Sequence, residues 1–230
     1  MEQNNKLITY LKNWTNCSRC EFGRFGKRVG MSFGEGDSNS KLMFIGEWPK
    51  NQMAEKEGTC LTDSEKTLLI KVLEFFGTNL QDVFISPMLS CRPCDSIGAT
   101  KKPGKVHLDS CNPRIDKTLD LVDPYVVVLI GQKAYNTFAK GSTKSTFASL
   151  TSNPRPIEIV TAGSSGVEIR RSAIVIRSLD WIIEKDRQQS RGGDLHRMMV
   201  AMQMAFTILD SYNSILNGIT PPPRQEVIDN

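Results

Sequence analysis

The sequence predicts an α/β fold, a three-layer α/β/α sandwich around a mainly parallel sheet of four or five strands. Three apolar runs carry this prediction, at residues 41–46, 82–88 and 125–130. The run at 41–46 is short and continuous, as expected for a strand that is buried on both faces of a parallel sheet. Helical patterns separate the runs, and strands that alternate with helices predict a parallel sheet covered on both faces.

The helices are predicted from their end signals and their apolar spacing. Residues Thr62-Asp63-Ser64-Glu65 form a capping box ahead of a helical apolar pattern that stops at Gly77. Asn112-Pro113 indicates the start of a second helix, with proline at its first position. A third helix opens at Gly131, and a long helix with a stripe of apolar residues and methionines begins at Asp194.

The remaining chain is predicted to be mostly loop and edge structure. Loops are expected at 21–40, 51–61, 92–112 and 140–156, a hairpin at 156–160 with 167–170, and a last strand at 172–176. No internal repeat or Pro/Gly linker divides the chain, so residues 1–220 are predicted to form a single domain. Residues 221–230 are predicted to be a disordered tail.

Composition excludes some classes of protein and leaves others open. Hydrophobic residues make up 39% and charged residues 23% of the 230 residues, which is ordinary for a globular protein. No apolar run approaches the roughly 20 residues that cross a bilayer, so no membrane partner is expected. The polar N-terminus lacks a signal-peptide pattern, which predicts an intracellular protein, cytoplasmic or nucleoid-associated. The net charge of +4 permits DNA as a partner without requiring it.

The cysteines suggest a metal centre, and their spacing leaves its nature open. In a reducing compartment, clustered cysteines favour metal binding over disulfides. Two pairs, Cys17-x2-Cys20 and Cys91-x2-Cys94, have the pattern of a zinc site that would leave Cys111 unused. Alternatively, Cys17, Cys20, Cys91 and Cys111 could be the four thiolate ligands of a [4Fe–4S] cluster. Buried cysteines without a metal are the third possibility.

Several motifs in order along the chain resemble those of the iron–sulfur uracil-DNA glycosylases, the family 4 group with its family 5 relatives. The matching segments are Cys17-x2-Cys20, Gly46-Glu47-Trp48-Pro49, Cys91-Arg92-Pro93, Cys111 and the strand segment 123–131. They cover the chain from about residue 15 to about residue 210. The four-cysteine framework is the specific part of the resemblance.

The resemblance implies both the fold and the cofactor. It implies a uracil-DNA glycosylase-like sandwich and a [4Fe–4S] cluster on Cys17, Cys20, Cys91 and Cys111. Zinc remains the alternative metal. Cys60 and Cys94 would then not be ligands, unless Cys94 replaces one of the four.

Glycosylases of this kind flip a base out of the helical stack and cleave its N-glycosidic bond in a pocket. The resemblance places Glu47 at the position of the family's catalytic carboxylate and Trp48 beside it in the pocket. Lys50 stands where the family has a glycine, which is expected to crowd the loop against a flipped nucleotide.

Three other pocket positions depart from the family pattern. Cys60 aligns with the family's stacking Phe, Pro87 with its base-reading Asn, and Ser178 with its anion-stabilising His. Proline has no amide to read a base, and serine is no substitute for an imidazole donor at neutral pH. Each of the two losses is expected to lower the rate by about 10²-fold or more. The pattern therefore predicts a pseudoenzyme for ordinary uracil excision.

Several basic and aromatic residues suit DNA binding. Lys101, Lys102 and Lys105 lie between two of the cysteines, and contacts from them to phosphate would add salt-dependent affinity. Arg177 and Trp181 flank the segment that wedges into DNA in the family. A solvated loop is the alternative interpretation of the lysines, and core packing is the alternative for Trp181.

Two functions remain open at this point. The first is a DNA-binding accessory protein in replication or repair, with a protein partner from that machinery and with uracil excision lost or much reduced. The second is an active, diverged glycosylase for uracil or a modified pyrimidine, in which Glu47 acts with new residues such as Ser178 or Asp180. A zinc-stapled interaction domain is a third, weaker possibility.

Overall fold

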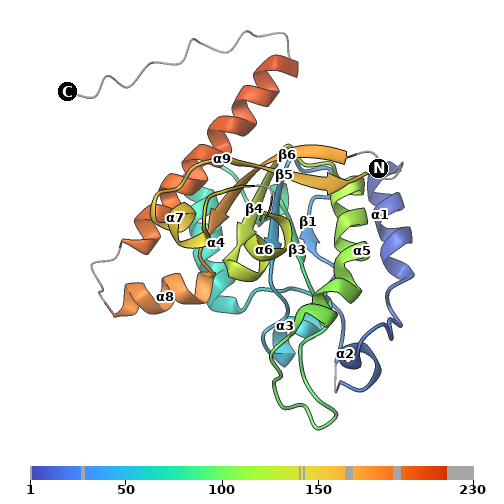
Figure 1. Cartoon of the computed structure of the whole chain (residues 1–230). Helices are drawn as coiled ribbons and strands as arrows, with labels where there is room; N and C mark the ends of the chain where they lie inside the picture. Colours follow the sequence, from blue (N-terminus) through green and yellow to red (C-terminus); the bar gives the residue numbers. More distant parts are fainter. Residues whose placement is uncertain are drawn as a thin grey trace, which may run out of the picture.

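The computed structural model describes residues 2–26, 29–139, 141, 143–163, 168–188 and 193–216. The predicted tail at 221–230 lies outside the described residues. Within them, one six-stranded sheet has the strand order β1-β3-β2-β4-β6-β5. Figure 1 shows the sheet in the middle of the molecule, with helices on both sides. The predicted α/β sandwich is confirmed.

The centre of the sheet is parallel and its two edges are antiparallel. Strands β3, β2, β4 and β6 run parallel to one another, while β1 and β5 pair antiparallel at the two edges. The strand bounds are β1 Glu35–Gly36, β2 Leu42–Gly46, β3 Phe84–Pro87, β4 Val126–Ile130, β5 Ile157–Ala162 and β6 Glu168–Ile176. The two-residue strand β1 adds a short edge within 21–40, a segment predicted as loop with room for one short strand.

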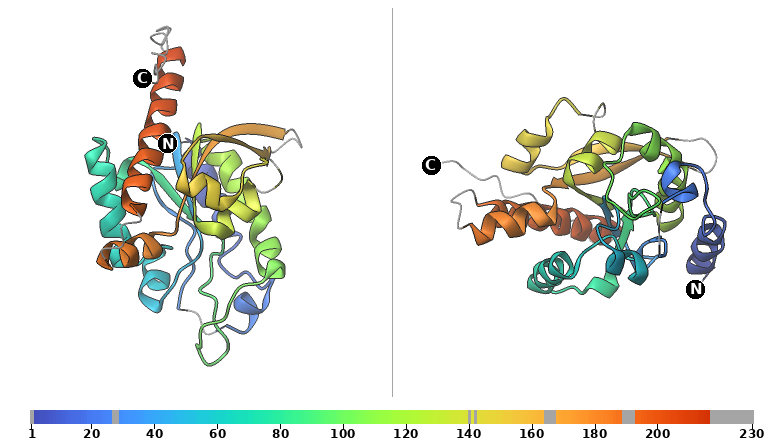
Figure 2. Two further views of the ribbon diagram at one scale, coloured as in Figure 1. Left: turned by 60° about the vertical axis from the view of Figure 1, so that its left-hand side comes forward. Right: turned by 90° about the horizontal axis from the view of Figure 1, so that it is seen from below.

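Helices cover the two faces of this sheet in separate groups. Their bounds are α1 Glu2–Lys12, α2 Glu21–Arg24, α3 Gln52–Glu57, α4 Asp63–Phe75, α5 Lys105–Val122, α6 Gly131–Phe138, α7 Phe147–Ser152, α8 Leu179–Arg187 and α9 Asp194–Leu216. Core residues of α4, α8 and α9 pack on one face, and those of α1, α5, α6 and α7 pack on the other. Both views in Figure 2 show the two groups on opposite sides of the sheet.

Strands β2 and β4 are apolar without interruption because both of their faces are covered. In β2, Leu42 and Phe44 belong to the core under α4 and α9, whereas Met43 and Ile45 belong to the core under α5. Successive side chains of a strand point to opposite faces, so a continuous apolar run fills both cores. This confirms the interpretation of the run at 41–46 as a buried parallel strand.

The predicted start of α4 is confirmed in its contacts. The Glu65 carboxylate accepts hydrogen bonds from the backbone N–H and from the hydroxyl of Thr62, both at 2.9 Å. These bonds satisfy groups at the helix start that have no partner inside the helix. The helix ends at Phe75, and Gly77 follows in a left-handed conformation with φ of +74°.

The predicted start of α5 is wrong. The helix begins at Lys105, and Pro113 lies inside it. Proline lacks an N–H, so a proline inside a helix removes one backbone hydrogen bond, while its carbonyl still accepts. Here the Pro113 carbonyl accepts a bond from the Tyr10 hydroxyl at 3.0 Å. Lys105 is therefore a helical residue and not part of a loop.

The hairpin and the last strand are not separate elements. Strand β6 is continuous from Glu168 to Ile176 and pairs with β5 and with β4; residue 167 of the predicted hairpin lies outside the described residues. Arg171 made the run look interrupted. Its buried guanidinium reaches Asp123 Oδ1 at 2.8 Å and the Pro124 carbonyl at 2.7 Å, so the charge is accommodated within the strand.

Four segments expected to lack regular structure contain helices. The short helices α2, α3 and α7 lie within the predicted loops, and α8 follows β6 directly. Asn51 accepts a bond from the backbone N–H of Ala54 at the start of α3, and Thr146 accepts one from Ser149 at the start of α7. Helices of about six residues carry too little apolar periodicity to be recognised from sequence.

Candidate functional site

The carboxyl ends of the parallel strands bring the predicted pocket positions to one end of the sheet. Gly46 ends β2, Pro87 ends β3, Gly131 follows β4, and Ser178 lies just beyond β6. In Figure 1 this is the lower end of the sheet, where α2, α3 and α8 also lie. Ligands of open α/β sheets bind outside the carboxyl ends of strands, so this end is the candidate site.

Glu47 is packed against the start of α6. A Cβ atom at Gly131 would lie 3.2 Å from Glu47 Oε1 and 3.5 Å from Ser178 Cβ, and Gly131 has a φ of +86°. Only glycine suits this position, which lets the carboxylate and Ser178 approach the same backbone. Burial raises the pKa of the Glu47 carboxyl, and the positive charge of Lys50 offsets part of that effect.

Lys50 joins two carboxylates from different helices. Its Nζ lies 3.0 Å from Asp180 Oδ2, and it forms a closer pair with Glu65 Oε1. Burial disfavours the ammonium, but the carboxylates of Glu65 and Asp180 outweigh burial and raise the pKa of Lys50. Burial likewise disfavours the Asp180 carboxylate, but hydrogen bonds from Ser178 and Lys50 leave the pKa of Asp180 lowered. Lys50 and Asp180 are therefore ionised and held in place.

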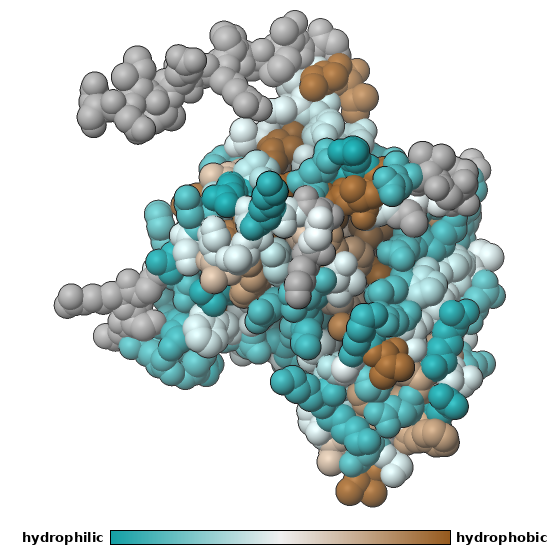
Figure 3. All heavy atoms as spheres, in the orientation of Figure 1, coloured by the Kyte–Doolittle hydropathy of each residue, from teal (hydrophilic) through white to brown (hydrophobic). Residues whose placement is uncertain are grey.

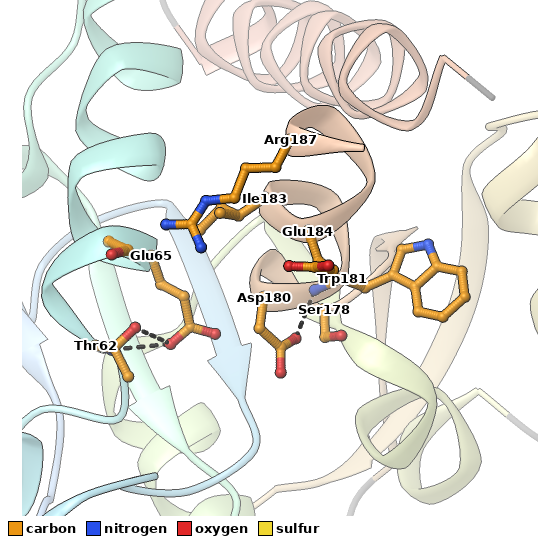
Figure 4. Close-up of a pocket in the computed structure, with 9 residues that line it drawn as sticks. Thr62, Glu65, Ser178, Asp180, Trp181, Ile183, Glu184 and Arg187 are labelled. Atoms are coloured by element: carbon orange, nitrogen blue, oxygen red, sulfur yellow. Dashed lines mark hydrogen bonds between the residues drawn. The ribbon is translucent and has the colours of Figure 1, made fainter. Parts of the chain in front are cut away.

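A cavity of about 460 Å³ opens between the start of α4 and α8. Its lining residues are Thr62, Ser64, Glu65, Ser178, Asp180, Trp181, Ile183, Glu184 and Arg187. In Figure 4, Glu65 faces Asp180 and Ser178 across this space, while the Trp181 ring points away from it. The lining is rich in carboxylates, since Glu65, Asp180 and Glu184 stand against the single arginine.

Cys60 and Pro87 are buried and offer little to a base. A Cβ atom at Gly46 would meet the Cys60 Sγ at 2.7 Å, so this thiol lies directly against the end of β2. Burial raises the pKa of Cys60 to about 12, so the thiol is neutral at physiological pH. Pro87 has no N–H, and its carbonyl accepts a short hydrogen bond from the Arg114 guanidinium.

Three of the four predicted ligand cysteines share one buried cluster. Cys20, Cys91 and Cys111 pack together with Phe22 and Leu89, and Trp48 packs against them. Trp48 therefore contacts the cysteine group and not the cavity beside α8. We call Cys17, Cys20, Cys91 and Cys111 the cysteine centre.

The thiols of the cysteine centre influence one another electrostatically. Burial raises the pKa of Cys111, the backbone of Ser90 hydrogen-bonds its sulfur, and Cys17 and Cys20 act on its charge. Cys17 thus lies within electrostatic range of the other thiols. In the part of the chain that the structure describes, no three Cys, His, Asp or Glu side chains stand close enough together to hold a single metal ion.

The other two cysteines lie elsewhere in the fold. Cys60 belongs to the core beneath α4, and Cys94 forms an isolated β-bridge with Thr100. Both are buried, and none of the six cysteines, all of which are described, forms a disulfide. That Cys60 and Cys94 are not ligands stays a prediction, since the Cys94 backbone lies close to segment 22–26, which follows Cys20.

A buried ion pair holds the loops around the cysteine centre. Glu55 is fully buried and accepts bonds from the backbone N–H of Val29 at 3.0 Å and of Arg92 at 3.2 Å. The Arg92 Nε also lies 3.3 Å from the Glu55 carboxylate. One carboxylate therefore ties α3 to the segment after Cys20 and to the loop after Cys91.

The three lysines predicted to bind DNA are not equivalent. Lys101 Nζ lies 3.5 Å from Glu21, and Lys105 Nζ lies 2.6 Å from Asp109 on the same helix. Lys102 is exposed and forms no ion pair among the described residues. The positive charge of this region is therefore partly neutralised.

Trp181 is a surface residue, so the interpretation as core packing is wrong. Its side chain is 44% exposed. The Arg177 Cζ lies 5.4 Å and the Lys185 Nζ 5.0 Å from the ring centre. Its indole N–H donates to Asp194 Oδ2 at 3.1 Å. The residue is an exposed aromatic platform with cations around it.

Two features of the site were missed from the sequence. Lys50 was expected to crowd the pocket, but its pairing with Glu65 and Asp180 joins residues far apart in the chain and has no local signal. Arg114 was not considered, because only its neighbour Ile115 was noted as part of the apolar face of the predicted helix. The missed signal was a charged residue next to the apolar face of the helix, only three positions after Cys111.

The structure thus combines an α/β/α sandwich with a carboxylate at a strand end and a neighbouring group of buried cysteines. The family model described as "Uracil DNA glycosylase superfamily" matches residues 33–176, more than half of the chain. The chain belongs to this superfamily. The matched range includes Glu47, Cys91 and Cys111, whereas Cys17, Cys20 and Ser178 lie outside it.

Curated relatives point to one branch of the superfamily. The chain is 26% identical over 162 residues to the type-4 uracil-DNA glycosylase of Sulfurisphaera tokodaii, covering 70% of this chain and 67% of that protein. It is 27% identical to that of Saccharolobus solfataricus over 50% of this chain and 51% of the relative. It is 25% identical to the type-4 uracil-DNA glycosylase of Thermotoga maritima, over 51% of this chain and 59% of that protein. The latter two alignments span little more than half of each relative.

The described helices give no indication of a membrane span. None of them combines the length and the apolar character that crossing a bilayer requires.

Proposed function

We propose that the protein is a DNA-binding member of the superfamily that carries a [4Fe–4S] cluster on the cysteine centre and excises uracil very slowly or not at all. We further propose an accessory role in DNA replication or repair, inside the cell and beside a protein of that machinery. The observation that carries the proposal is the ion-paired group of Lys50, Glu65 and Asp180 at the strand-end site.

The charges of the strand-end site oppose the departure of an anion. Cleavage of the N-glycosidic bond leaves uracil with a negative charge, which a glycosylase must stabilise. Here Glu47, Glu65 and Asp180 lie near Lys50, which is already engaged with two of these carboxylates. Like charges nearby disfavour a new anion.

The groups that would read and hold a base are also missing. Proline at position 87 offers no amide, and its carbonyl is engaged by Arg114. Cys60 offers no ring for stacking. Ser178 bonds to Asp180 and cannot supply an imidazole donor. These contacts support slow excision from three independent positions.

The residues of the cysteine centre fit an iron–sulfur cluster better than a zinc ion. Zinc binds each thiolate at about 2.3 Å, so its four sulfurs stand only about 3.8 Å apart in a tetrahedron. Cys20, Cys91 and Cys111 share one buried cluster, and no three metal-binding side chains of the described residues have that close grouping. A four-iron cluster binds each thiolate on a different iron and needs wider spacing. When bound, it would tie the Cys17 loop, the Cys91 loop and α5 together.

Residues near the cavity supply the proposed DNA contacts. The exposed Trp181 can stack on an unpaired base. Arg177 beside it is partly buried and paired with Asp194 at 3.3 Å, so its contribution to phosphate binding is reduced. Lys102 adds a charge at a second point, with Lys101 and Lys105 contributing less because of their carboxylate partners. Figure 3 shows a mainly hydrophilic face in which apolar side chains are scattered, as suits contact with a polar ligand.

The test compares excision and binding on the same DNA. Purified protein and the Sulfurisphaera tokodaii enzyme are each given single- and double-stranded oligonucleotides that contain one uracil. We expect binding by both proteins and single-turnover excision at least about 10²-fold slower for this protein. Excision at the rate of the relative would overturn the proposal, as would the absence of any DNA binding.

One observation favours an active, diverged glycosylase as the second candidate. Glu47 remains at the carboxyl end of β2, beside Ser178, and burial raises its pKa. A carboxylate in that place could act on water or on a developing cation. The assay is a panel of uracil and modified-pyrimidine substrates with wild type and Glu47→Ala. An activity that survives this substitution unchanged would exclude the second candidate.

A further inference from the structure

Arg114 is a fully buried arginine at the junction between β3 and the cysteine centre. It lies on α5 three residues after Cys111 and has no exposed surface. Its NH1 nitrogen lies 3.3 Å from Ser86 Oγ, and its NH2 nitrogen lies 3.3 Å from the Met88 carbonyl and closer to that of Pro87. The side chain therefore holds the end of β3, which leads to Cys91, against the helix that carries Cys111.

The charge of Arg114 has no carboxylate partner. Among the ion pairs of the described residues, the buried guanidinium groups of Arg92 and Arg171 are matched by Glu55 and Asp123, and none includes Arg114. Its Nε is buried and is without a hydrogen-bond acceptor in the described part of the chain. A buried cation without a counter-charge is strongly unfavourable.

The ionisable groups that act on Arg114 are mainly thiols. After burial, which disfavours its charged form, the largest influences are Cys111, Tyr10, Cys60 and Cys91, all of which favour the cation. Two of these, Cys91 and Cys111, belong to the cysteine centre. A centre whose cysteines are deprotonated would thus supply the negative charge that the guanidinium lacks.

We propose that Arg114 is the counter-charge and positioning residue of the cysteine centre, and that it favours the reduced state of the cluster proposed above. The inference rests on that cluster. Four thiolates make the centre negative, and one electron taken from an external reductant adds a further negative charge without breaking a bond. A guanidinium fixed nearby in a medium of low dielectric stabilises the more negative state.

A purely structural role for Arg114 would look different in solution. A latch between β3 and α5 would affect folding and iron retention but not the reduction equilibrium of a cluster that is present. Arg114→Met removes the charge and keeps the volume approximately, whereas Arg114→Lys keeps the charge. Arg171→Met is the matched control, because Arg171 is equally buried but bonds to Asp123 and the Pro124 carbonyl in place of the thiols.

The experiment measures iron content and midpoint potential of full-length protein purified without oxygen, using a mediated titration with dithionite. We expect Arg114→Met to lower the equilibrium constant for reduction at least tenfold, a shift of about 59 mV for one electron. Arg114→Lys should stay within threefold of wild type, and Arg171→Met should not shift the equilibrium.

Each outcome decides something. An unchanged potential in iron-loaded Arg114→Met overturns the inference and leaves the proposed function standing. If Arg114→Met fails to hold iron, Arg114→Lys decides: a wild-type potential supports the counter-charge, and a tenfold shift overturns it. Wild-type protein that binds no iron overturns the cluster itself, and the inference with it.

Discussion

The cysteine centre and the pocket at the strand ends, formed by Glu47, Cys60, Pro87 and Ser178, lie at the same end of one sheet. The cysteine centre has the cysteines that the family resemblance leads one to expect, whereas the pocket lacks several of the expected residues. Strand β3 reaches both, since Pro87 ends it and Cys91 follows four residues later. Around the cysteine centre the thiols are buried together, and Glu55 and Arg92 bind the neighbouring loops. In the pocket, the expected aromatic, amide and imidazole are replaced by other residues.

The difference indicates that stability and chemistry depend on separate parts of this end of the molecule. Removing a buried thiol or the Glu55 carboxylate leaves loops without partners, which is costly to the fold. The residues that differ from the family pattern in the pocket are compatible with the fold because they form contacts within it. Lys50, for example, forms ion pairs with Glu65 and Asp180. A pocket can therefore lose its reaction without loss of the scaffold.

The largest expected effect is on the cysteine centre. Cys91→Ser should abolish iron binding and lower the free energy of unfolding by roughly 3 kcal/mol, a fall in Tm of about 6–12 °C. Cys94→Ser is the matched control, since Cys94 is equally buried but lies outside the centre. Iron analysis and calorimetry check both variants. Equal iron loss in the two variants would show that Cys94 replaces one of the four ligands.

The next effect concerns the exposed rim of the pocket. Trp181→Ala should weaken binding of single-stranded DNA about tenfold, as expected for the loss of one stacked base. Phe75→Ala removes an aromatic ring that is 72% exposed at the end of α4, away from Arg177 and Lys185, and should leave binding unchanged. Fluorescence anisotropy measures both. Equal losses would indicate that general surface hydrophobicity, and not a platform at Trp181, binds the DNA.

A smaller effect tests the charge inside the pocket. Because burial raises the pKa of Glu47 above the usual 4.5, the folded protein holds this proton more tightly than the unfolded chain. Its contribution is favourable below that pH and is lost as the pH rises through the folded-state pKa. Glu47→Gln should therefore stabilise the protein at pH 7 and stabilise it less near pH 4. Denaturant titrations at both pH values measure this, and a gain that is larger at low pH contradicts it.

The smallest effect belongs to the basic surface. Lys102→Ala should reduce the slope of log binding constant against log salt concentration by about 0.9 for duplex DNA. Lys105→Ala should reduce it less, because Lys105 is paired with Asp109. Titrations at several salt concentrations decide between them. Slopes that match wild type in both variants would place the DNA elsewhere on the surface.

The sheet was predictable where the chain carries its own signal. Continuous apolar runs marked β2 and β4, a mainly apolar segment marked β3, and the capping pair of Thr62 and Glu65 marked α4. The start of α5 was misplaced because proline is common at the first position of a helix, and nothing local shows that Pro113 lies in a later turn. Strand β6 looked broken because the acceptors of Arg171 lie 47 and 48 residues earlier in the chain.

The sequence predicted where the site residues lie in the fold but not which residues they contact. Sequence motifs placed Glu47, Pro87 and Ser178 at one end of the sheet, since strand ends meet there. They could not show what each position contacts. The Lys50 bridge joins residues 65 and 180, and Arg114 is distinguished only by its burial and its missing partner. These contacts arise from tertiary packing between distant segments, so no periodic pattern in the sequence indicates them.

The distance along the chain between the thiols has a consequence for how the protein resists heat. Cys17 and Cys111 are 94 positions apart, so a cluster that joins them acts as a cross-link over a long loop, worth about 4 kcal/mol in loop-closure entropy. If the proposed cluster is lost when the chain unfolds, the separated thiols could not rebuild it without iron and sulfide. Thermal inactivation would then be irreversible, and its rate would set the lifetime of the molecule.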